Sequence, residues 1–362
     1  MSTFHYCDYS LLQLPSEVRQ RLERRGVANL FCTLGFGESY CYPPGERVCF
    51  LENRAGEIVD QCVYRESPWM WFLRQIDVLG PIDPNGHLFR ELRRRTRAHR
   101  INSHWISPQE FPRNGQAGRA LVFRRTGEDL CIALPDSPSL YLQSLGSTTR
   151  KHLPYYLRRL RKEWGEAWSF EVCTGQEIHK AAFDQLLELQ RLRAATKRQQ
   201  TLWTEGLREH RWSLVKEKGM LCCLWYREKL VGGTLSFVYA NEAYLIVIAH
   251  DPEFDRLNVG NLTLWFTIEH LIHCRHKVFH LMWGQSFYKK QFGGVLQPLF
   301  KMEFFASSWV AAAWRVAEAL RILKAWDVFS RFGRRIALRM PRHVAKTTRI
   351  PSVSRQASHG GG

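Results

Sequence analysis

The chain has 362 residues, a length that suits two lobes of about 100–200 residues each. Hydrophobic residues make up 45% and aromatic residues 13% of the sequence, so a substantial core is expected, and disordered or collagen-like chains are excluded. The net charge of +18 says nothing about the fold. It predicts attraction to anions, such as nucleic acid, an acidic membrane surface or a phosphate-rich small molecule.

The ten cysteines include no Cys-x-x-Cys pair, which argues against a zinc ribbon or a thioredoxin-like site. Scattered cysteines in a chain of this size are typical of reduced thiols in the cytosol. The first residues lack the basic start and apolar run of a signal peptide. No segment of about 18 uninterrupted apolar residues is present, so no transmembrane helix is expected.

The first lobe, residues 1–135, is predicted to mix helices and strands. Helices are expected over 15–25 and over the arginine-rich segment 86–99. Strands are expected over 47–52 and 57–65, joined by a hairpin turn at 53–56. A second short strand pair is expected over 119–125 and 129–133, turning at Gly127-Glu128.

A domain boundary is predicted near Leu134–Pro138, because Ser137 followed by Pro138 is a helix start. A basic helix then runs to Trp164, with an apolar face at helical spacing. Pro154 is expected to end or kink any helix that enters it from Thr149.

The second lobe, residues 136–308, shows a definite order of predicted elements. These are a strand at 167–173, a helix at 176–198, a helix capped by Thr204, strands at 220–226, 230–238 and 243–250, a helix at 260–275, a strand at 278–283, a short helix at Tyr288 and a strand at 300–307. This order predicts an α/β or α+β layer fold. No internal sequence repeat is visible.

A basic amphipathic helix is expected in residues 309–340, with its apolar stripe between Trp309 and Leu323. Residues 341–362 are polar and basic, and the composition favours disorder.

The order of elements in the second lobe resembles the GNAT acyltransferase fold. Several blocks are similar to the acetyltransferase domain of the cellulose-biosynthesis (CelD-type) family, which is related to the Fem-type aminoacyltransferases with their two GNAT-like lobes. The blocks are Leu134-Pro135-Asp136-Ser137, Tyr141-Leu142, Arg150-Lys151, Arg158-Arg159-Leu160, Asp251-Pro252, Gly260 and Trp283-Gly284-Gln285-Ser286-Phe287-Tyr288-Lys289. The resemblance implies a GNAT-like mixed sheet flanked by helices, preceded by a smaller, degenerate GNAT-like lobe.

The resemblance implies acetyl-CoA or another acyl-CoA as donor, with no metal. A helix N-terminus can hold a pyrophosphate, and glycine lets the backbone approach a ligand. The predicted cradle is therefore Asn258, Val259, Gly260, Asn261 and Leu262, assisted by Arg256. The alternative is that Gly260 is an ordinary loop glycine, since the loop has one extra residue and only one glycine compared with the family pattern. By resemblance, the backbone of Ile246, Val247, Ile248 and Ala249 pairs with the pantetheine arm of the donor.

Acyl transfer needs a proton donor for the leaving sulfur and a base for the acceptor. By resemblance, Tyr288 is the donor, and Lys289 holds a phosphate or lowers the pKa of the tyrosine. A packing role for Tyr288 and a solvated Lys289 explain the sequence equally well. His250 and Asp251, at the end of a strand, are the candidate bases. His270, His273 and His276 share helical spacing, but Arg275 and Lys277 argue against a cation there.

The implied acceptor is an amine or hydroxyl of a sugar, a glycan precursor or an amino-acid-like molecule. Three alternatives are Fem-like aminoacyl transfer, binding of a polyanion or nucleic acid without catalysis, and attachment of the 309–339 helix to a membrane surface. No sequence signature of a nucleic-acid-binding module is present, so nucleic acid is not the expected partner. The expected location is the cytoplasm, at the inner face of the membrane where the chain contacts membrane or polysaccharide machinery.

Overall fold

The computed structural model of the chain describes residues 4–40, 45–70, 73–106, 121–196, 203 and 205–320. The chain forms two units, residues 1–307 and residues 308–362. In the second unit the described residues form one helix, α10 (Ser308–Leu320), which confirms the start of the helix predicted there. The predicted tail, 341–362, lies outside the described residues. Among the residues described, no helix has the length and apolar composition needed to cross a membrane.

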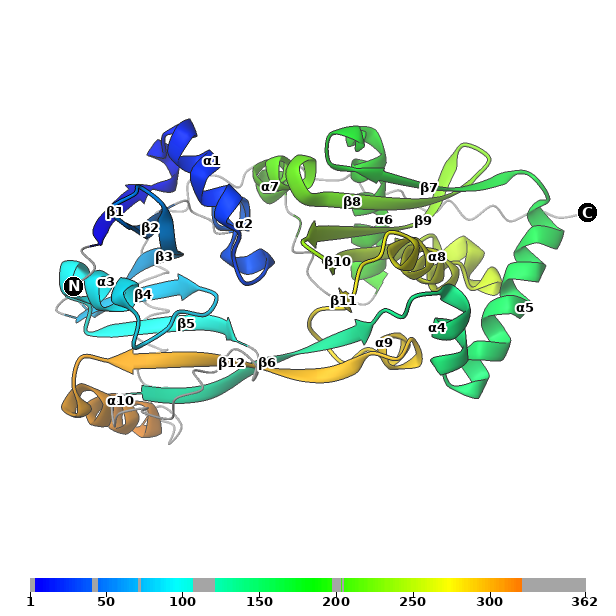
Figure 1. The fold of residues 1–362 in the computed structure, drawn as a ribbon. Coiled ribbons are helices and arrows are strands. Elements are labelled where there is room, and N and C mark those ends of the chain that lie inside the picture. Colours follow the sequence, from blue (N-terminus) through cyan, green and yellow to red (C-terminus); the bar gives the residue numbers. More distant parts are fainter. Residues whose placement is uncertain are drawn as a thin grey trace, which may run out of the picture. The chain divides into compact units, whose positions relative to one another are not determined.

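The first unit begins with six strands and three α-helices (Figure 1). They are β1 (His5–Ser10), α1 (Ser16–Arg25), α2 (Leu34–Tyr40), β2 (Glu46–Glu52), β3 (Ile58–Met70), β4 (Leu73–Leu79), α3 (His87–Thr96), β5 (Arg100–Ile106) and β6 (Leu121–Ala133). The predicted hairpin is confirmed, because β2 and β3 pair antiparallel on either side of residues 53–57.

The second half of this unit follows the predicted order of elements. They are α4 (Pro138–Ser144), α5 (Ser147–Trp164), β7 (Trp168–Thr174), α6 (Lys180–Thr196), α7 (Glu205–Lys218), β8 (Gly219–Tyr226), β9 (Lys229–Tyr239), β10 (Glu242–His250), α8 (Val259–His273), β11 (Val278–His280), α9 (Phe287–Gln291) and β12 (Val295–Phe305). A 3-10 helix, Pro252–Leu257, connects β10 to α8. The predicted cap Thr204 lies outside the described residues.

The described strands form one sheet in the order β1-β2-β3-β4-β5-β12-β6-β11-β10-β9-β8-β7. Each half repeats the same topology. Four strands pair antiparallel, a fifth strand pairs parallel with the fourth, and a sixth strand, from the other half, pairs antiparallel with the fifth. A helix joins the two parallel strands in both halves, α3 between β4 and β5 and α8 between β10 and β11. The mixed α/β fold with a GNAT-like first lobe is thus present as predicted.

The two halves exchange their last strands at the middle of the sheet. Strand β6, from the first half, pairs with β11, and β12, from the second half, pairs with β5. The predicted turn at Gly127-Glu128 is wrong, because β6 continues through it as one strand. Pro298 and Leu299 of β12 lie opposite these two residues, so the long partner strand keeps them extended.

The entry to the second half shows one prediction confirmed and one corrected. The Ser137 side chain accepts a hydrogen bond from the Leu140 amide and caps α4, with Pro138 in the first turn. Helix α5, in contrast, runs through Pro154 rather than ending there. Its buried Leu153 and Leu160 pack in the core against α8 residues, and this burial offsets the hydrogen bond that the proline removes.

Two apolar layers enclose the sheet of the second half. Residues of α8 pack with Cys222 and Leu224 on one face, and residues of α6 pack with Leu221 and Cys223 on the other. Adjacent residues of β8 therefore belong to opposite cores, as the pleat of a strand requires. Both faces of β10 are consequently covered, and this fixes the strand that borders the candidate site.

Candidate active site

Strands β10 and β11 part after a short parallel contact. They pair only over Glu242–Tyr244 and Val278–His280. Within the described residues, the rest of β10, Leu245–His250, pairs with no strand on that side. The register between β9 and β10 also shifts at Ile246, where one residue bulges out. The backbone edge of β10 that the resemblance assigns to the pantetheine arm is therefore open on this side.

An apolar cavity of about 320 Å³ borders the unpaired part of β10. Strand β10 contributes Leu245, Ile246 and Ile248, and α9 contributes Tyr288 and Lys289. The remaining lining residues are Phe31, Phe36, Gln190, Trp203, Leu281, Met282 and Trp283. Phe31 and Phe36 come from the first half of the unit, so both halves build this cavity.

A smaller, polar recess of about 90 Å³ lies at the N-terminus of α8. It is lined by Arg193, Ile248, His250, Asp255, Asn258, Gly260, Asn261 and Tyr288. The recess and the apolar cavity share Ile248 and Tyr288. The amides of Asn261 and Leu262 already donate to the Asn258 carbonyl. In the described part of the chain, the amide of Gly260, which lines the recess, remains to bind an anion.

Arg193 of α6 is the cation of this recess. Its guanidinium donates to the Ile248 carbonyl at 3.2 Å, which places the charge beside the unpaired edge of β10. Arg193 was not predicted from the sequence, because the residue lies within a long charged helix with no motif around it. Only the packing of α6 against β10 places Arg193 at the recess.

Tyr288 lines both hollows and is partly buried. Burial raises the pKa of its hydroxyl, while the nearby Arg193 guanidinium opposes this effect. The phenol therefore stays protonated at neutral pH and is a potential donor of a hydrogen bond or a proton beside these hollows.

Lys289 points into the protein, not toward a solvated phosphate. The residue is 5% exposed, and Nζ donates to the carbonyls of Met282 at 3.1 Å and Trp283 at 2.5 Å. Burial lowers the pKa of this amine to about 8, although the charge of Asp129 partly offsets the effect. Lys289 lines the apolar cavity and is absent from the polar recess, so the predicted phosphate contact is corrected.

His250 and Gly260 are packed against each other. A Cβ atom on Gly260 would lie 2.6 Å from Nδ1 of His250, so the close packing of this ring requires glycine. His250 Nε2 lies 2.7 Å from Asp255 Oδ1, and the buried Nδ1 has no hydrogen-bond partner among the described residues. This arrangement holds the imidazole against the start of α8, where it lines the polar recess.

Asp251 is also held in a structural role. Its carboxylate caps the 3-10 helix by accepting from the Glu253 amide, and it pairs with Lys229 at 2.8 Å. Burial favours the neutral carboxyl, but these hydrogen bonds hold the pKa of Asp251 below its usual value. Asp251 lines neither hollow, so its predicted role as a base is corrected.

The other predicted ligands divide by the direction of their side chains. Arg256 pairs with Glu163 of α5 at 2.8 Å and lines neither hollow. The side chains of Val247, Ala249, Val259 and Leu262 are buried in the two cores, so these residues can reach a ligand only through their backbone. Ile246, Ile248, Asn258, Gly260 and Asn261 line the hollows, and their contact with a donor stays a prediction.

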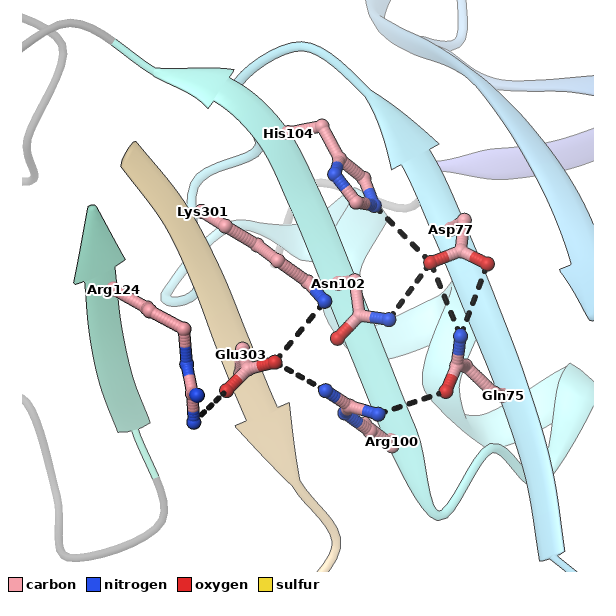
Figure 2. A network of polar contacts seen from close by, with 8 residues as sticks. All are labelled: Gln75, Asp77, Arg100, Asn102, His104, Arg124, Lys301 and Glu303. Carbon is pink, nitrogen blue, oxygen red and sulfur yellow. Dashed lines mark hydrogen bonds and ion pairs between the residues drawn. The ribbon is translucent and has the colours of Figure 1, made fainter. Parts of the chain in front are cut away.

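The equivalent strand pair of the first half is bridged by polar side chains (Figure 2). Asp77 of β4 accepts hydrogen bonds from Asn102 at 2.7 Å and from Gln75, and His104 lies 3.1 Å away. Burial disfavours the charged form, but the bonds from His104, Asn102 and Gln75 hold the pKa of Asp77 below its usual value. Beyond the last strand pair, the Ser103 hydroxyl donates to the Gly80 carbonyl at 2.6 Å and ties the strands together.

A buried ion pair extends the same network toward the middle of the sheet. Arg100 of β5 bonds Glu303 of β12, which also receives Lys301 at 3.1 Å and Arg124 at 3.4 Å. Figure 2 shows these side chains directed toward one another, and they come from β4, β5, β12 and β6, which are neighbours in the sheet. The parallel strand pair of the first half is thus bridged by a charged cross-strand network.

Comparisons with known proteins agree with this geometry. A family model described as an acetyltransferase (GNAT) domain matches residues 147–290, from the start of α5 into α9. The chain is similar to the crystal structure of FemX, with 10% identity and a TM-score of 0.62 over 83% of this chain and 97% of that chain. It is also similar to L-PGS from Bacillus licheniformis, with 10% identity and a TM-score of 0.53 over 80% and 92%. No curated protein has a matching sequence. At these identities the solved structures show the fold alone, and the GNAT family model matches only the second half.

Proposed function

We propose that the chain is an acyl-CoA-dependent N- or O-acyltransferase that moves an acyl group, in the first instance acetyl, directly to an amine or hydroxyl. The observation that carries the proposal is the opening between β10 and β11, whose apolar cavity meets the polar recess at α8 through Ile248 and Tyr288. A donor that carries its acyl thioester at one end of a long arm and its phosphates at the other needs two adjoining hollows of these two kinds.

The donor would bind along the unpaired edge of β10. Its pantetheine arm would pair with the backbone of Ile246–Ala249, and its pyrophosphate would bind the amide of Gly260 with Arg193 beside it. A cavity of about 320 Å³ is at the lower end of the usual range for small-molecule sites, about 300–1,000 Å³. The acyl end and the acceptor would share this cavity.

Two side chains can move the protons that the reaction requires. The acceptor nitrogen or oxygen forms a bond to the acyl carbon, the carbon–sulfur bond breaks, and the leaving thiolate takes the hydroxyl proton of Tyr288. Lys289 is the group suited to accept the acceptor's proton. A neutral amine has two N–H donors, which the carbonyls of Met282 and Trp283 occupy, and its lone pair remains available.

The acceptor class rests on resemblance. The blocks similar to the cellulose-biosynthesis (CelD-type) branch favour a sugar, a glycan precursor or an amino-acid-like acceptor. Such a role suits a cytoplasmic protein working at the inner face of the membrane, beside polysaccharide machinery. The net charge of +18 supports attraction to an anionic acceptor or surface.

Thermal unfolding with acetyl-CoA, free CoA and ATP tests the donor site. A ligand at about 100 times its dissociation constant stabilises the fold by about 2.7 kcal/mol. We expect a shift with both CoA species and none with ATP, and the shift should shrink in Arg193→Met. The exposed Arg158 of α5 offers the matched control, since Arg158→Met removes the same charge away from the recess. Equal shifts with ATP, or equal loss in both variants, would reduce the binding to general attraction of polyanions.

Fem-like aminoacyl transfer is the second candidate. The observation that favours it is the repeated topology of the two halves, together with a fold shared with FemX over 97% of that chain. The two candidates differ in the donor. Transfer of radiolabelled acetyl from acetyl-CoA to an amine or sugar panel supports the first, whereas transfer only from aminoacyl-tRNA supports the second. A folded chain that binds RNA with steep salt dependence and transfers neither group would favour the third candidate, a polyanion-binding protein.

A further inference from the structure

Three different metal-binding side chains meet where β10 and β11 part. Strand β6 supplies Asp129 and Cys131, and β11 supplies His280. His280 Nδ1 lies 2.6 Å from Asp129 Oδ2 and 3.3 Å from Cys131 Sγ, and Cys131 Sγ lies 3.2 Å from Asp129 Oδ2. Asp129 is 6% and Cys131 is 4% exposed, so this group belongs to the interior.

The donor atoms match the preferences of one metal. Zn²⁺ takes thiolate sulfur, imidazole nitrogen and carboxylate oxygen at about 2.0–2.3 Å in a tetrahedral arrangement. In such a tetrahedron the donors lie roughly 3.3–3.5 Å apart. Two of the three observed separations are close to that value, and the third, between Asp129 and His280, is shorter and would open when an ion enters.

We propose that Asp129, Cys131 and His280 bind one zinc ion. A second observation points to a ligand: Oδ1 of the buried Asp129 has no hydrogen-bond partner among the described residues. A buried carboxylate oxygen without a partner is costly, and a cation beside this carboxylate would relieve the cost. Three protein ligands leave the fourth position of the ion for water or for a second bond to Asp129.

The surroundings of His280 resemble those of a metal-bound histidine. Its other ring nitrogen, Nε2, lies 3.4 Å from Glu242 Oε2, and that carboxylate also accepts the Tyr244 hydroxyl at 2.5 Å. The Tyr244 ring stacks on the imidazole with 4.3 Å between centroids. The Glu242 carboxylate thus lies where the outer partners of zinc-bound histidines lie, although Nε2 makes no hydrogen bond to it in this structure.

Binding would release two protons. The ion replaces the proton of the Cys131 thiol and the proton that Nδ1 of His280 donates to Asp129, and no oxidation or reduction is involved. The ion would then join β6 to β11 beside the last residue pair of β10 and β11. We assign it a structural role at the start of the opening, a role that does not depend on the acyltransferase proposal.

Another three-donor group, His5, Cys7 and Glu52, lies near the surface and provides the control. His5 Nδ1 lies 3.2 Å from Cys7 Sγ, but Arg21 pairs with Glu52 at 2.6 Å and competes for its carboxylate. A cation would have to displace this arginine. Cys7→Ser therefore removes a cysteine beside a histidine and a carboxylate without touching the proposed site.

The test is metal binding by the reduced, chelator-stripped full chain. Zinc content by mass spectrometry should reach one ion per chain in the wild type and in Cys7→Ser, and binding should be lost in Cys131→Ser. With Co²⁺ in place of zinc, the wild type and Cys7→Ser should show near-ultraviolet sulfur-to-cobalt absorption, and Cys131→Ser should not. Glu242→Gln keeps all three ligands and should weaken zinc binding about 10–100-fold with the cobalt spectrum retained.

Two results would overturn the proposal. One is a wild type that binds no zinc or shows no sulfur-to-cobalt absorption. The other is equal binding by the wild type and Cys131→Ser. If Cys131→Ser does not fold, the wild-type cobalt spectrum and the zinc affinity of Glu242→Gln test the proposal instead. A zinc affinity that Glu242→Gln leaves unchanged would also exclude a site at His280.

Discussion

The imidazole of His250 leaves no room for a side chain at residue 260. A Cβ atom there would lie 2.6 Å from Nδ1 and 2.9 Å from Cε1 of the ring. Gly260→Ala should therefore lower the free energy of unfolding by about 1–3 kcal/mol, the usual result of overpacking. Chemical denaturation measures this change. The same substitution should weaken binding of a CoA ligand, because Gly260 lines the polar recess.

Gly206 of α7 is the matched control for that substitution. A Cβ atom on Gly206 would have no neighbouring atom within 4 Å, and the residue is helical and exposed. Gly206→Ala should be neutral or stabilise the fold by up to about 1 kcal/mol. If Gly260→Ala behaves like Gly206→Ala, the contact with His250 is not tight, and the packing explanation of Gly260 fails.

The amine of Lys289 predicts how stability depends on pH. Burial lowers its pKa to about 8 in the folded chain, from 10.5 for the free side chain. Between these two values the unfolded chain binds more protons, so this residue makes the free energy of unfolding rise with pH. Below about pH 8 the penalty for burying the charged amine is fully present.

Lys289→Met removes this titration. The difference in free energy of unfolding between the wild type and Lys289→Met should therefore move in favour of the wild type as the pH rises from 7 to 10. Urea unfolding at several pH values measures it, with Lys290→Met at the exposed neighbouring position as the control. A difference that stays constant over this range would contradict a lowered pKa.

Helix α5 contains a proline that its packing tolerates. Pro154 lies in the interior of Ser147–Trp164 and removes one backbone hydrogen bond, a change worth up to about 3 kcal/mol. Pro154→Ala should raise the free energy of unfolding by about 1–3 kcal/mol and raise the melting temperature in calorimetry. A lower melting temperature would mean that packing on α8 depends on the shape that the proline imposes.

Local patterns predicted most elements, but they failed where a distant strand decides the outcome. Gly127-Glu128 is a good turn sequence, and only pairing with β12 keeps it extended. The strand predicted over 278–283 ends at His280. Leu281 donates instead to Leu130 of β6, and Met282 has a positive φ of 60°. Neither the hydrogen bond of Leu281 nor the positive φ of Met282 could be predicted from the local sequence.

The candidate site could be predicted only in part, because contacts between distant segments also decide which side chains line it. The chemistry of a helix N-terminus located the start of α8, and the resemblance located Tyr288; both line the hollows. Arg193 was not predicted, and the contacts that Lys289, Asp251 and Arg256 make here differ from the roles predicted for them. Charged side chains pair with the groups that lie near them in the folded chain. The spacing of residues along one segment does not reveal these neighbours.

At the scale of the whole molecule, the repeat is one of topology and not of sequence. The parallel pair of the second half carries Tyr244 and His280 where the first carries Asp77 and Asn102. Both positions hold polar, buried contacts, but the residue types differ completely. A comparison of the amino-acid sequences of the two halves finds no repeat, whereas the strand order shows that the topology is repeated.

The exchange of β6 and β12 predicts that the halves cannot fold apart. A fragment of residues 1–135 retains β6 but lacks β12, so β5 loses its antiparallel neighbour. A fragment of residues 136–307 retains β12 but lacks β6, so β11 loses Cys131–Ala133. Each fragment would expose an unpaired strand edge and part of its core to water.

We expect each fragment alone to be unfolded or aggregated in circular dichroism and size-exclusion chromatography. Expressed together, the two fragments should form a one-to-one complex, because the β6–β12 ladder runs from Leu121 to Cys131 and the β5–β12 and β6–β11 ladders also join them. Folding of residues 136–307 alone would show that the second half is an independent domain. The apolar cavity contains Phe31 and Phe36 of the first half, so even a folded second half should bind a CoA ligand less tightly than the complex.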